Sequence, residues 1–479
     1  MDDFKSKPAY QIADLIRRRE VSPVEVAEAH LKRIEEVNPV LNAFVDLDAD
    51  RVRRDAREAE AALSRGDSVG PLHGIPLSIK SAIDVEGLRC ECGTRLREGN
   101  IAASDAPLVA RLRAAGALIL GVTNVPDLLV AYETDNLLYG RTNNPWNMDY
   151  TAGGSSGGES AAIASGCSVA GIGSDGGGSI RVPAHFCGLY GLKPTAGLIP
   201  RTGHWPDCIG PSALLASVGP LARSARDLEL ILNATMGEDA ADPSSGPYNL
   251  AAIDEISPDQ VKIGFYEDDG VIPVTAETKK AVRNSCKAFE DQGFAVEPFR
   301  PEGIESVREL WWMLFGIAGV ERLQPLLKGK EDQLHSLVRD LLQPPDDPLE
   351  ASLREFLLAW DTRDMLRSKL LESMREYRAL ICPVASIPAF RHGERSWAID
   401  GREVTYPKAF SYSQAYNLLG NPSVVVPAGY SDEGLPIGVQ IVGRPFDDRF
   451  VLALAQRFEE AAGEWTPPPE PTSLTASTR

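Results

Sequence analysis

The sequence predicts an α/β protein with a mostly parallel sheet, because amphipathic helical segments and short apolar strands alternate along most of the chain. The composition agrees with this class, since 43% hydrophobic and 24% charged residues are typical of an ordinary globular enzyme. The length of 479 residues allows one large α/β domain or roughly two or three smaller ones, and length alone does not decide between them.

The first 66 residues are predicted to be helical and to form a packing layer. The sequence Ser22-Pro23-Val24-Glu25 is a capping box with proline at the first helical position, and apolar residues follow it at helical spacing. A second helix, charged and rich in alanine, is expected at about residues 48–64. Neither helix carries side chains arranged for chemistry.

Residues 74–80 are predicted to form a short buried strand that ends in Lys80. A lysine in this position is unusual, because burial of an unpaired ammonium group is costly and lowers its pKa. A helix at 107–115, a cap at Gly116 and a strand at 117–122 then form an α/β unit.

The stretch from Thr151 to Arg181 contains two glycine–serine clusters, at 153–158 and 176–179, joined by a predicted helix and strand. Glycine loses more backbone freedom on folding than any other residue, so two such clusters around serines require a physical reason. The usual reason is that backbone N–H groups approach another group closely. Here we expect that group to be a developing oxyanion.

The second half of the chain continues the alternation but contains one long helical interruption. The expected elements are a helix at 224–236, a strand at 261–266, a helix at 275–292, strands at 294–299, 379–382, 422–426 and 438–442, and a helix at 447–462. Residues 302–377 are mainly helical, are broken at 343–348, and include Trp311, Trp312 and Phe315, so they are a candidate wall of a substrate pocket. The tail at 467–479 is expected to be frayed.

The charge, the apolar runs and the cysteine content of the sequence argue against nucleic-acid, membrane and metal partners. A net charge of -19 argues against a nucleic-acid partner, because such binding depends on Lys and Arg that neutralise phosphates. The N-terminus lacks the apolar core of a secretion signal and the longest apolar run, 310–320, is too short to span a bilayer, so we expect a cytoplasmic protein without a membrane partner. Seven scattered cysteines fit reduced thiols and no metal site. The oligomeric state stays open, with a homodimer as one option.

Residues 171–176, Gly-Ile-Gly-Ser-Asp-Gly, match the GxGxxG fingerprint of dinucleotide-binding proteins. The match is weak, because such a site also needs a helix that starts at the motif and an acidic residue about 20 positions later. Further glycines and Pro183 follow here instead, and the GxxxxGK[ST] phosphate loop is absent from the sequence. We therefore expect no nucleotide cofactor.

A serine–histidine–aspartate hydrolase is disfavoured as well. Ser179 does not fit the GxSxG nucleophile elbow, since Ile180 and Arg181 follow it. None of the six histidines is obviously placed as a base. His185 is close to Ser179 in sequence but lies among apolar residues, where a hydrogen-bonded core histidine is the stronger expectation.

Lys80, Ser155 and Ser179 remain as three groups that could act together. A lysine deprotonated by burial is a competent general base, and a second serine can relay a proton from the nucleophile to the lysine. Glycines before Ser179 leave successive N–H groups free to converge on an oxyanion, which is usually a large contribution to catalysis. A glycine-rich turn around a surface serine would explain neither the second serine nor the strand-terminal lysine.

Several segments around these residues form a wider pattern. They are Gly-Gly-Ser-Ser-Gly-Gly at 153–158, Gly-Ser-Asp-Gly-Gly-Gly-Ser-Ile-Arg-Val-Pro-Ala at 173–184, and the flanking segments at 74–80, 143–146, 187–195 and 434–440. This pattern resembles the amidase signature family of hydrolases over most of the chain. The separations along the chain between Lys80, Ser155 and Ser179 also agree with those of the family.

The resemblance implies a serine hydrolase without a metal or an organic cofactor. It makes Ser179 the nucleophile, Ser155 the proton relay and Lys80 the base, with the Gly154–Ser155 peptide bond in the cis form. The oxyanion hole would consist of the backbone N–H groups of Gly176, Gly177, Gly178 and Ser179.

The resemblance also implies supporting residues, a pocket and a fold. Ser156, Asp175 and Arg181 correspond to side chains that brace the catalytic loop in relatives, and Leu129 and Tyr132 fall in the stretch that lines the acyl pocket. The implied fold is a single domain over 1–479, in which a large mixed twisted sheet lies between helices and residues 302–377 are a helical insertion.

Two positions depart from the family pattern. The residue after the lysine is commonly acidic in relatives and is Ser81 here, which could alter the support around the lysine. The position commonly occupied by Ile or Thr is Gly176 here, which could loosen or widen the loop. Neither departure touches the three catalytic candidates.

The expected activity is hydrolysis of a C–N bond in a small-molecule carboxamide or carbamate, with aryl amides, fatty amides and aryl carbamates all compatible with the apolar residues near the site. One alternative is the A subunit of a glutamyl-tRNA amidotransferase, which shares the signature but works in a complex with tRNA. Residues 203–207 are more similar to fatty-acid-amide-hydrolase relatives, and no basic tract is visible. A non-catalytic binding protein on the same scaffold is disfavoured because all three catalytic positions are filled.

Overall fold

A large β-sheet forms the centre of the protein in the computed structural model, which describes residues 4–253, 256–342 and 350–470. The 11 strands that it comprises in this part of the chain are, in spatial order, β1 (Phe44–Leu47), β3 (Leu118–Thr123), β2 (Pro76–Lys80), β6 (Ala170–Asp175), β8 (Ser217–Ala222), β7 (Tyr190–Lys193), β14 (Ser423–Tyr430), β15 (Pro436–Val442), β11 (Tyr377–Pro383), β9 (Lys262–Phe265) and β10 (Ala295–Pro298). Two further strand pairs are β4 (Asn143–Asn144) with β5 (Asn147–Thr151) and β12 (Ser396–Ile399) with β13 (Arg402–Thr405). The predicted break at 343–348 and residues 471–479 of the predicted tail lie outside the described residues.

The sheet is mixed, so the prediction of a mostly parallel sheet is wrong. Among the described strands, the parallel neighbours are β2–β3, β2–β6, β9–β10 and β9–β11, and the other six neighbouring pairs are antiparallel. Strand β8, which runs antiparallel between β6 and β7, was not predicted. Its central Gly219 and Pro220 explain the omission, because both residues argue against a strand in the middle of a sheet. The mixed sheet implied by the family resemblance is confirmed.

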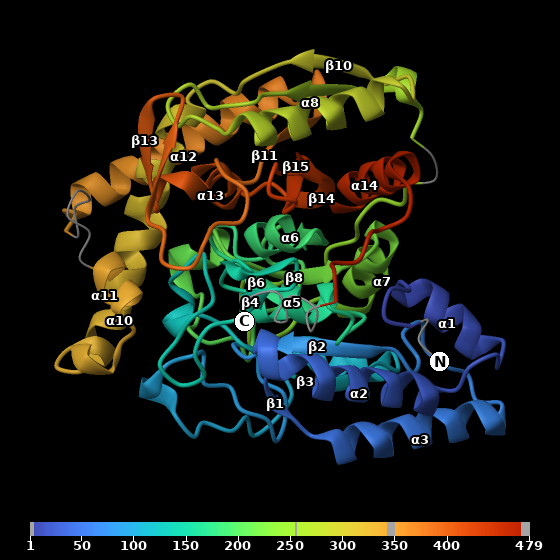
Figure 1. Cartoon of the computed structure of the whole chain (residues 1–479). Coiled ribbons are helices and arrows are strands. Elements are labelled where there is room, and N and C mark those ends of the chain that lie inside the picture. The colour runs from blue at the N-terminus through green and yellow to red at the C-terminus, as the bar shows by residue number, and fades with distance from the viewer. Residues whose placement is uncertain (1–3, 254–255, 343–349, 471–479) are drawn as a thin grey trace.

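Helices cover both faces of the sheet (Figure 1). The α-helices are α1 (Ala9–Arg17), α2 (Pro23–Leu41), α3 (Ala49–Arg65), α4 (Pro107–Ala114), α5 (Gly157–Ala164), α6 (Arg181–Cys187), α7 (Ala225–Thr235), α8 (Ala276–Glu290), α9 (Val307–Trp311), α10 (Ala318–Leu327), α11 (Ser336–Leu342), α12 (Leu353–Ser373), α13 (Ser411–Leu418) and α14 (Asp448–Ala462). Short 3-10 helices are η1 (Arg95–Arg97), η2 (Asp127–Leu129), η3 (Gly210–Leu214), η4 (Pro258–Gln260), η5 (Ile304–Ser306), η7 (Glu331–Gln333) and η8 (Lys408–Phe410). Helices α1, α4, α7, α8 and α14 share one apolar cluster with the sheet, and α2, α5 and α6 contribute to a second.

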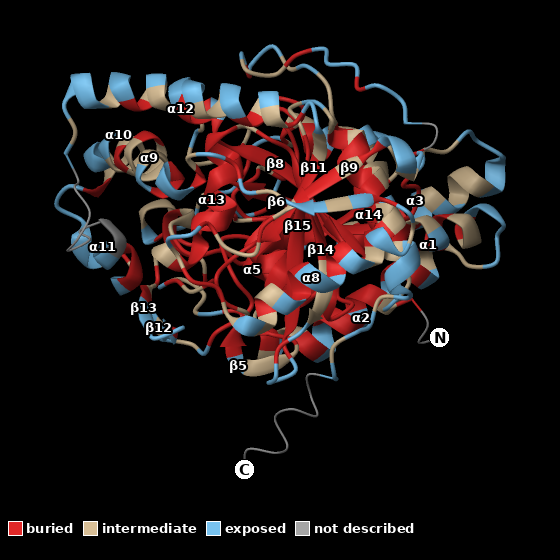
Figure 2. Cartoon of the chain, turned by 90° about the horizontal axis from the view of Figure 1, so that it is seen from above, coloured by how far each residue is buried: buried red, intermediate tan, exposed pale blue. Residues whose placement is uncertain are grey.

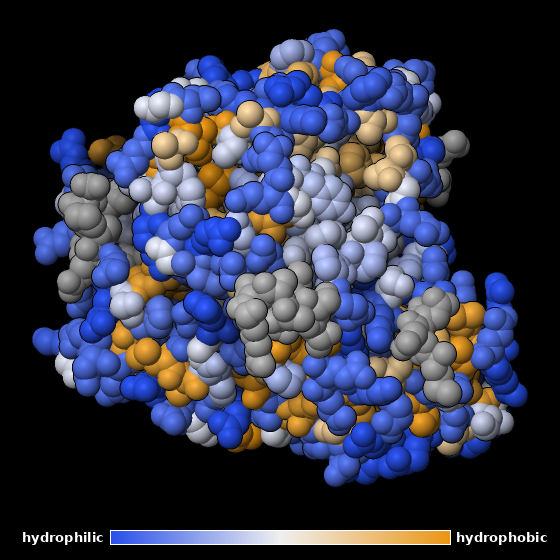
Figure 3. Space-filling model, in the orientation of Figure 1, coloured by the Kyte–Doolittle hydropathy of each residue, from blue (hydrophilic) through white to orange (hydrophobic). Residues whose placement is uncertain are grey.

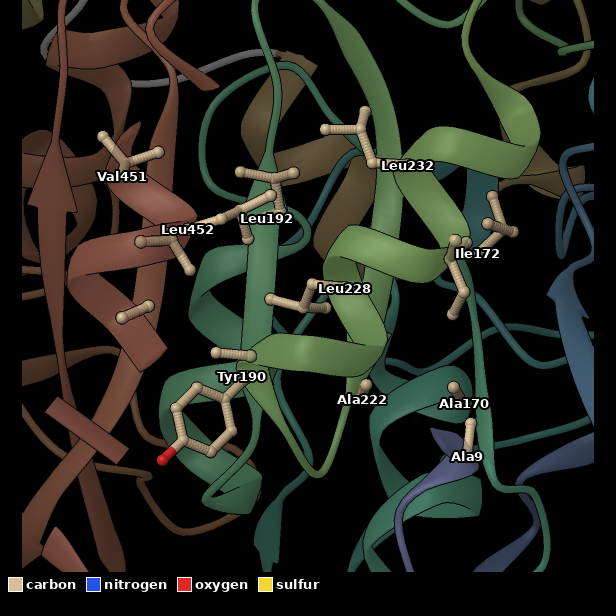
Figure 4. Packing of buried hydrophobic residues seen from close by; sticks show 14 of the residues in the cluster. Ala9, Ala170, Ile172, Tyr190, Leu192, Ala222, Leu228, Leu232, Val451 and Leu452 are labelled. Atoms are coloured by element: carbon tan, nitrogen blue, oxygen red, sulfur yellow. The ribbon is translucent and has the colours of Figure 1, made fainter. Parts of the chain in front are cut away.

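The first of these clusters fixes the sheet against its helices (Figure 4). Leu228 and Leu232 of α7 belong to the same cluster as Leu192 of β7 and Ile172 of β6, and all four side chains are fully buried. Full burial of one leucine stabilises a fold by about 1.5–3 kcal/mol. Many such contacts hold rigidly the strands whose ends carry the candidate site.

Most elements predicted from periodicity are present. Ser22 Oγ accepts the N–H of Glu25 and Glu25 Oε2 accepts the N–H of Ser22, which confirms the capping box at the start of α2. The helices predicted near 48–64, 107–115, 224–236, 275–292 and 447–462 correspond to α3, α4, α7, α8 and α14. Elements β1, β7, α6 and α13 were not anticipated from the sequence.

The carboxyl ends of β2 and β6 bring distant parts of the chain together. The two strands are parallel, with Ile79 opposite Ile172, so their carboxyl ends lie at the same edge. Lys80 is the last residue of β2, and the second glycine–serine cluster follows β6 directly. Helix α5 begins within the first cluster, and α6 begins shortly after the second.

A helical segment lies to one side of the sheet (Figures 1 and 2). We call residues 307–327 the aromatic arm; it consists of α9, a π-helical turn η6 (Trp312–Ile317) and α10. Helices α11 and α12 follow it, and α12 shows a largely exposed outer side in Figure 2. The molecular face in Figure 3 is mainly hydrophilic, with scattered hydrophobic groups. Within the described ranges, no helix has both the length and the apolar character needed to cross a bilayer.

Candidate active site

Lys80 has a fully buried side chain at the end of β2. Its Nζ lies 2.7 Å from Ser155 Oγ, 3.0 Å from Ser156 Oγ and 3.1 Å from Ser174 Oγ. Burial lowers the pKa of Lys80 to about 7, although the negative charge of Asp175 acts in the opposite direction. A substantial fraction of Lys80 is therefore neutral near pH 7 and can accept a proton.

The first glycine–serine cluster presents two hydroxyl groups to Lys80. The Gly154–Ser155 peptide bond is cis, as the family resemblance implied. The Ser155 side chain bridges the distance between Lys80 and the cavity described below, which Ser155 borders. The N–H of Ser156 donates to the carbonyl oxygen of Ser179 at 3.1 Å, and this bond ties the first cluster to the second.

The second cluster forms the loop between β6 and α6, and a buried ion pair holds the two ends of this loop. Arg181 Nη2 donates to Asp175 Oδ1 at 3.0 Å and Arg181 Nε donates to Asp175 Oδ2 at 3.1 Å. Burial would raise the pKa of Asp175, but the Arg181 guanidinium lowers it below its usual range. Arg181 also donates to Gln440 on β15 and to Asn417 on α13, so the loop is anchored to two further elements.

Side chains from outside the loop hold its carbonyl groups. Trp311 Nε1 donates to the Gly176 carbonyl oxygen at 2.8 Å. Tyr132 Oη and Ser413 Oγ donate to the Gly177 carbonyl oxygen at 3.1 and 2.9 Å. Because each peptide unit is planar, a fixed carbonyl group also fixes the direction of the following N–H group. The loop is therefore preorganised before any substrate binds.

The backbone N–H groups of the loop are not equivalent. Gly178 has a φ of +123° and its N–H donates to Asp175 Oδ1 at 2.7 Å, so this N–H is not free to bind an oxyanion as expected. No hydrogen bond in the described part of the chain uses the N–H of Gly176, Gly177 or Ser179. These three residues border the cavity in front of the loop, and Gly178 is not among its lining residues.

A cavity of about 400 Å³ lies in front of these groups. Its wall includes Ser155, Ser179, Leu129 and Tyr132, so the structure brings the predicted pocket residues to the same space as two of the three catalytic candidates. Further apolar lining comes from Leu128, Val130, Trp205, Trp311, Trp312 and Phe315. A mainly apolar cavity that also contains polar groups suits a small organic ligand.

Tyr132 has a second role in this site that the sequence did not indicate. Its ring stacks on Phe410 with the centroids 3.9 Å apart. Its hydroxyl group accepts a hydrogen bond from Gln414 Nε2 at 2.8 Å while it donates to the Gly177 carbonyl group. Tyr132 is therefore both part of the cavity wall and a support of the glycine-rich loop.

Gly176 and Ser81, the two departures from the family pattern, lie in different environments. A Cβ at Gly176 would overlap Cζ of Phe315, which stacks on Trp311 with a centroid distance of 5.3 Å. The space freed at Gly176 is therefore filled by Phe315 of the aromatic arm, and Trp311 holds the Gly176 carbonyl group. Ser81 is buried, and its N–H donates to the carbonyl oxygen of Thr123 at 3.1 Å.

Two histidines near the site differ in position. His185 is buried, its Nε2 bonds to the Ile387 carbonyl oxygen at 3.0 Å, and its Nδ1 accepts the N–H of Gly438 at 2.7 Å, so it is a hydrogen-bonded core histidine as expected. His204 borders the cavity and contacts Ser174, which was not foreseen from the sequence. In the part of the chain that the structure describes, no group of three His, Cys, Asp or Glu side chains is arranged to hold a metal ion.

Comparison with known proteins identifies the family. A sequence model of the Amidase family matches residues 25–452. The chain belongs to the amidase signature family. This match confirms the resemblance seen in the sequence, and with it the expectation of an amidase.

Relatives of this amidase include proteins of more than one activity. An acylamidase of Rhodococcus erythropolis is 35% identical over 469 residues, with 94% of each chain covered. The A subunit of the glutamyl-tRNA(Gln) amidotransferase of Heliobacterium modesticaldum is 30% identical over 488 residues, with 96% of this amidase and 97% of the relative covered. The crystal structure of a bacterial aryl acylamidase of the amidase signature family superposes with a TM-score of 0.83 at 27% identity and covers 99% of both chains.

Proposed function

We propose that this amidase hydrolyses apolar or aromatic carboxamides with Ser179 as nucleophile, Ser155 as proton relay and Lys80 as base. The observation that carries the proposal is the distance of 2.7 Å between Lys80 Nζ and Ser155 Oγ, with the lysine fully buried behind the serine and the cavity in front of it. Burial is what makes a lysine neutral enough to act as a base near pH 7.

In the first half of the reaction, Ser179 Oγ attacks the carbonyl carbon of the amide and a C–O bond forms. The Ser179 proton passes to Ser155 Oγ while the Ser155 proton passes to Lys80 Nζ, and the carbonyl oxygen takes the electron pair of its π bond. The proton then returns from Lys80 through Ser155 to the amide nitrogen. The C–N bond breaks, and an acyl ester on Ser179 remains.

In the second half, a water molecule attacks the ester carbonyl group and gives its proton to the same relay. Collapse of the tetrahedral intermediate returns the proton to Ser179 and releases the carboxylic acid. The relay has the same protonation state before and after the cycle, so no cofactor is required for the balance of atoms.

The free N–H groups of Gly176, Gly177 and Ser179 would stabilise the oxyanion in both tetrahedral intermediates. The hydrogen bond from Trp311 to the Gly176 carbonyl group supports this role, because the same planar peptide unit carries the N–H of Gly177 and fixes that donor before charge develops. Removal of one such donor typically costs about 2.7–4 kcal/mol of transition-state stabilisation.

The shape and lining of the cavity support an aromatic or other apolar substrate. The aromatic arm contributes Trp311, Trp312 and Phe315 to its lining, and the segment around η2 contributes Leu129 and Tyr132. The acyl group and the leaving amine would therefore both meet apolar surface. An aryl carbamate presents the same shape and would be attacked at its carbonyl carbon by the same route.

A hydrolysis screen tests the proposal. Acyl chain length and leaving amine should be varied separately, with an aryl carbamate included, and wild type compared with Ser179→Ala. We expect hydrolysis of anilides or long-chain amides, and labelling of wild type but not Ser179→Ala by a fluorophosphonate probe. Equal labelling of the two proteins, or no rate above that of Ser179→Ala, would refute the assignment.

The second candidate function is that of the A subunit of an amidotransferase, which the Heliobacterium modesticaldum relative favours. The two functions share the catalytic residues and differ in partner. Purification from the native cell with a tagged chain distinguishes them: a stable stoichiometric partner and glutamine-dependent activity support the second candidate, whereas hydrolysis of simple amides by the isolated chain supports the first.

A further inference from the structure

His204 is held beside the catalytic lysine by the backbone on both sides of it. The N–H of Asp84 donates to the Gly203 carbonyl oxygen at 2.8 Å, and the N–H of Trp205 donates to the Ala82 carbonyl oxygen at 2.8 Å. Ala82 and Asp84 both follow β2 within a few residues of Lys80. The main chain therefore fixes where the His204 side chain begins, and the two hydrogen bonds of the ring fix the imidazole.

The hydrogen bonds of His204 define which ring nitrogen carries the proton. Nδ1 lies 3.0 Å from the carbonyl oxygen of Pro206, which can only accept, so Nδ1 is protonated. Burial lowers the pKa of His204 to about 3, and the nearby positive charge of Lys80 acts in the same direction, so the ring is neutral. Nε2 then has a free lone pair, and Ser174 Oγ at 2.9 Å must donate to it.

This donation fixes how Ser174 interacts with Lys80. The hydroxyl proton of Ser174 is directed to His204, so Ser174 Oγ can only accept from Lys80 Nζ, 3.1 Å away. Ser156 Oγ is in a similar state, because it donates to the Ser174 carbonyl oxygen at 3.4 Å and lies 3.0 Å from Lys80 Nζ. Each of these two hydroxyl oxygens offers a lone pair to the lysine.

A neutral lysine has two N–H groups and one lone pair. The Ser174 carbonyl oxygen, 3.3 Å from Nζ, can also only accept, so it shares one N–H with Ser174 Oγ of the same residue. With Ser156 Oγ accepting the other N–H, the lone pair is left for Ser155 Oγ, the closest neighbour at 2.7 Å. That orientation is the one in which Ser155 can transfer its proton. A Ser174 hydroxyl that donated to Lys80 would occupy the same lone pair and block the transfer.

We propose that His204 is a positioning residue, which by accepting the Ser174 proton turns Ser174 into an acceptor for Lys80 and keeps the lysine lone pair directed at Ser155. The inference rests on the proposed function of Lys80 as base. His204 does not contact Ser179 through any of its hydrogen bonds in the described part of the chain, and it acts through two other side chains.

The other charged and titratable groups around Lys80 do not set the direction of the Ser174 hydroxyl group. The carboxylate of Asp175 is held by Arg181, and that of Glu159 accepts from Ser78 and Thr123. The remaining groups that act on the pKa of Lys80 or His204 are the thiols of Cys92 and Cys208 and the guanidinium of Arg201. In these interactions, no group other than His204 accepts the Ser174 hydroxyl proton within the described residues.

The test compares His204→Leu, which keeps an apolar volume but offers no acceptor, with His204→Gln, whose amide oxygen can accept from Ser174. We expect His204→Leu to lower kcat by about 10-fold or more while KM changes less, since general-base transfer contributes about 10²- to 10⁴-fold. The acidic limb of the kcat/KM profile should move to lower pH, because a donating Ser174 stabilises neutral Lys80. His204→Gln should restore most of the lost kcat and the wild-type position of the limb.

A double-mutant cycle with Ser174→Ala separates this role from a merely structural one. If His204 acts through Ser174, His204→Leu should have an effect of less than about 3-fold when Ser174 is already alanine. Full additivity of the two substitutions, or an unchanged profile in His204→Leu, would overturn the proposal. If His204→Leu does not fold, a cycle of Ser174→Ala with His204→Gln takes its place. An acidic limb of the kcat/KM profile that stays unmoved in Ser174→Ala would also overturn the proposal.

Failure of the proposed function has a different signature. In that case Lys80→Met and Ser179→Ala would retain hydrolysis, whatever the His204 variants do. If those two variants are inactive and only the His204 pattern is absent, the positioning role alone is refuted.

Discussion

The ends of β2 and β6 and the aromatic arm border the same cavity but are built differently. Lys80 and Asp175 at the strand ends, with Arg181 at the start of α6, are almost completely buried, and each makes several hydrogen bonds. In the arm, Trp311 and Phe315 are only partly buried; they contact the loop through the indole hydrogen bond to Gly176 and through ring packing against Gly176 and Gly177. In the proposed mechanism, the reaction therefore depends on buried groups that each make several hydrogen bonds. Selectivity depends on partly buried aromatic side chains, which tolerate substitution better.

The largest difference between the two regions should appear on removal of Ser179, the proposed nucleophile. Ser179→Ala should lower kcat/KM by at least about 10⁴-fold, because the residues of a catalytic unit act together. Ser64→Ala on the exposed part of α3 is the control and should be indistinguishable from wild type. Steady-state kinetics with one anilide measures both; a loss below about 10-fold in Ser179→Ala would mean that the chemistry lies elsewhere.

The ion pair that holds the loop should matter next, this time for stability. Arg181→Met leaves the Asp175 carboxylate buried without its partner, which typically costs about 3–5 kcal/mol in the free energy of unfolding. Arg17→Met removes an exposed partner of Asp14 and should cost less than about 1 kcal/mol. Urea unfolding of both variants checks the contrast, and equal costs would contradict it.

The pH dependence of kcat/KM should be set by Lys80 at the end of β2 and not by the aromatic arm. In the proposed mechanism Lys80 acts as a base when neutral, and burial lowers its pKa to about 7. The value of kcat/KM should therefore fall about tenfold per pH unit as the pH drops below 7. At pH 5 the rate should be about 100-fold below its plateau. Trp312→Ala in the arm should show the same acidic limb; a profile that is flat between about pH 5 and 8 would exclude a lysine base with this pKa.

The contact between loop and arm should give a smaller, reciprocal effect. Gly176→Ala places a Cβ where Phe315 Cζ lies, and overpacking of this kind typically costs about 1–3 kcal/mol. Removal of the ring in a Gly176→Ala, Phe315→Ala double variant should recover part of the lost stability. Thermal unfolding of the four proteins in the cycle measures the coupling, and strict additivity would mean that the two residues do not meet.

The smallest effect should come from the arm by itself. Trp312 lines the cavity, and Trp312→Ala should change the ratio of kcat/KM between an anilide and a short aliphatic amide by about 3- to 10-fold. The labelling rate with a small fluorophosphonate should stay within a factor of about 2. A large fall in that labelling rate would show that the arm supports the nucleophile and not only the substrate.

Much of the local structure could be predicted from the sequence, because local signals are strong there. The capping box at Ser22, the strand that ends at Lys80 and the two glycine–serine clusters all follow from residue types at short spacing. The mixed direction of the sheet did not follow, because Gly219 and Pro220 conceal a central strand. The mixed sheet came instead from the resemblance to a family.

The supports of the site were largely outside the reach of sequence reasoning. Trp311, Ser413 and Gln440 reach the loop from segments more than 100 residues away. Gln440 lies in a segment that carries the family resemblance, but no local signal identifies any of the three as a partner of a carbonyl group or an arginine. Tyr132 was expected in the pocket but not as a donor to Gly177. His204 lies in a segment marked in the sequence only by its family likeness, and its contact with Ser174 depends on how two loops at the strand ends meet.

The single indole hydrogen bond from Trp311 to Gly176 has a consequence for the evolution of new substrates. Because the arm contacts the glycine-rich loop through Trp311 and Phe315, substitutions elsewhere along it can accumulate while the arrangement of Lys80, Ser155 and Ser179 is preserved. A laboratory evolution experiment that selects for a different leaving amine should therefore collect its early mutations in residues 312–327 and leave the strand ends unaltered.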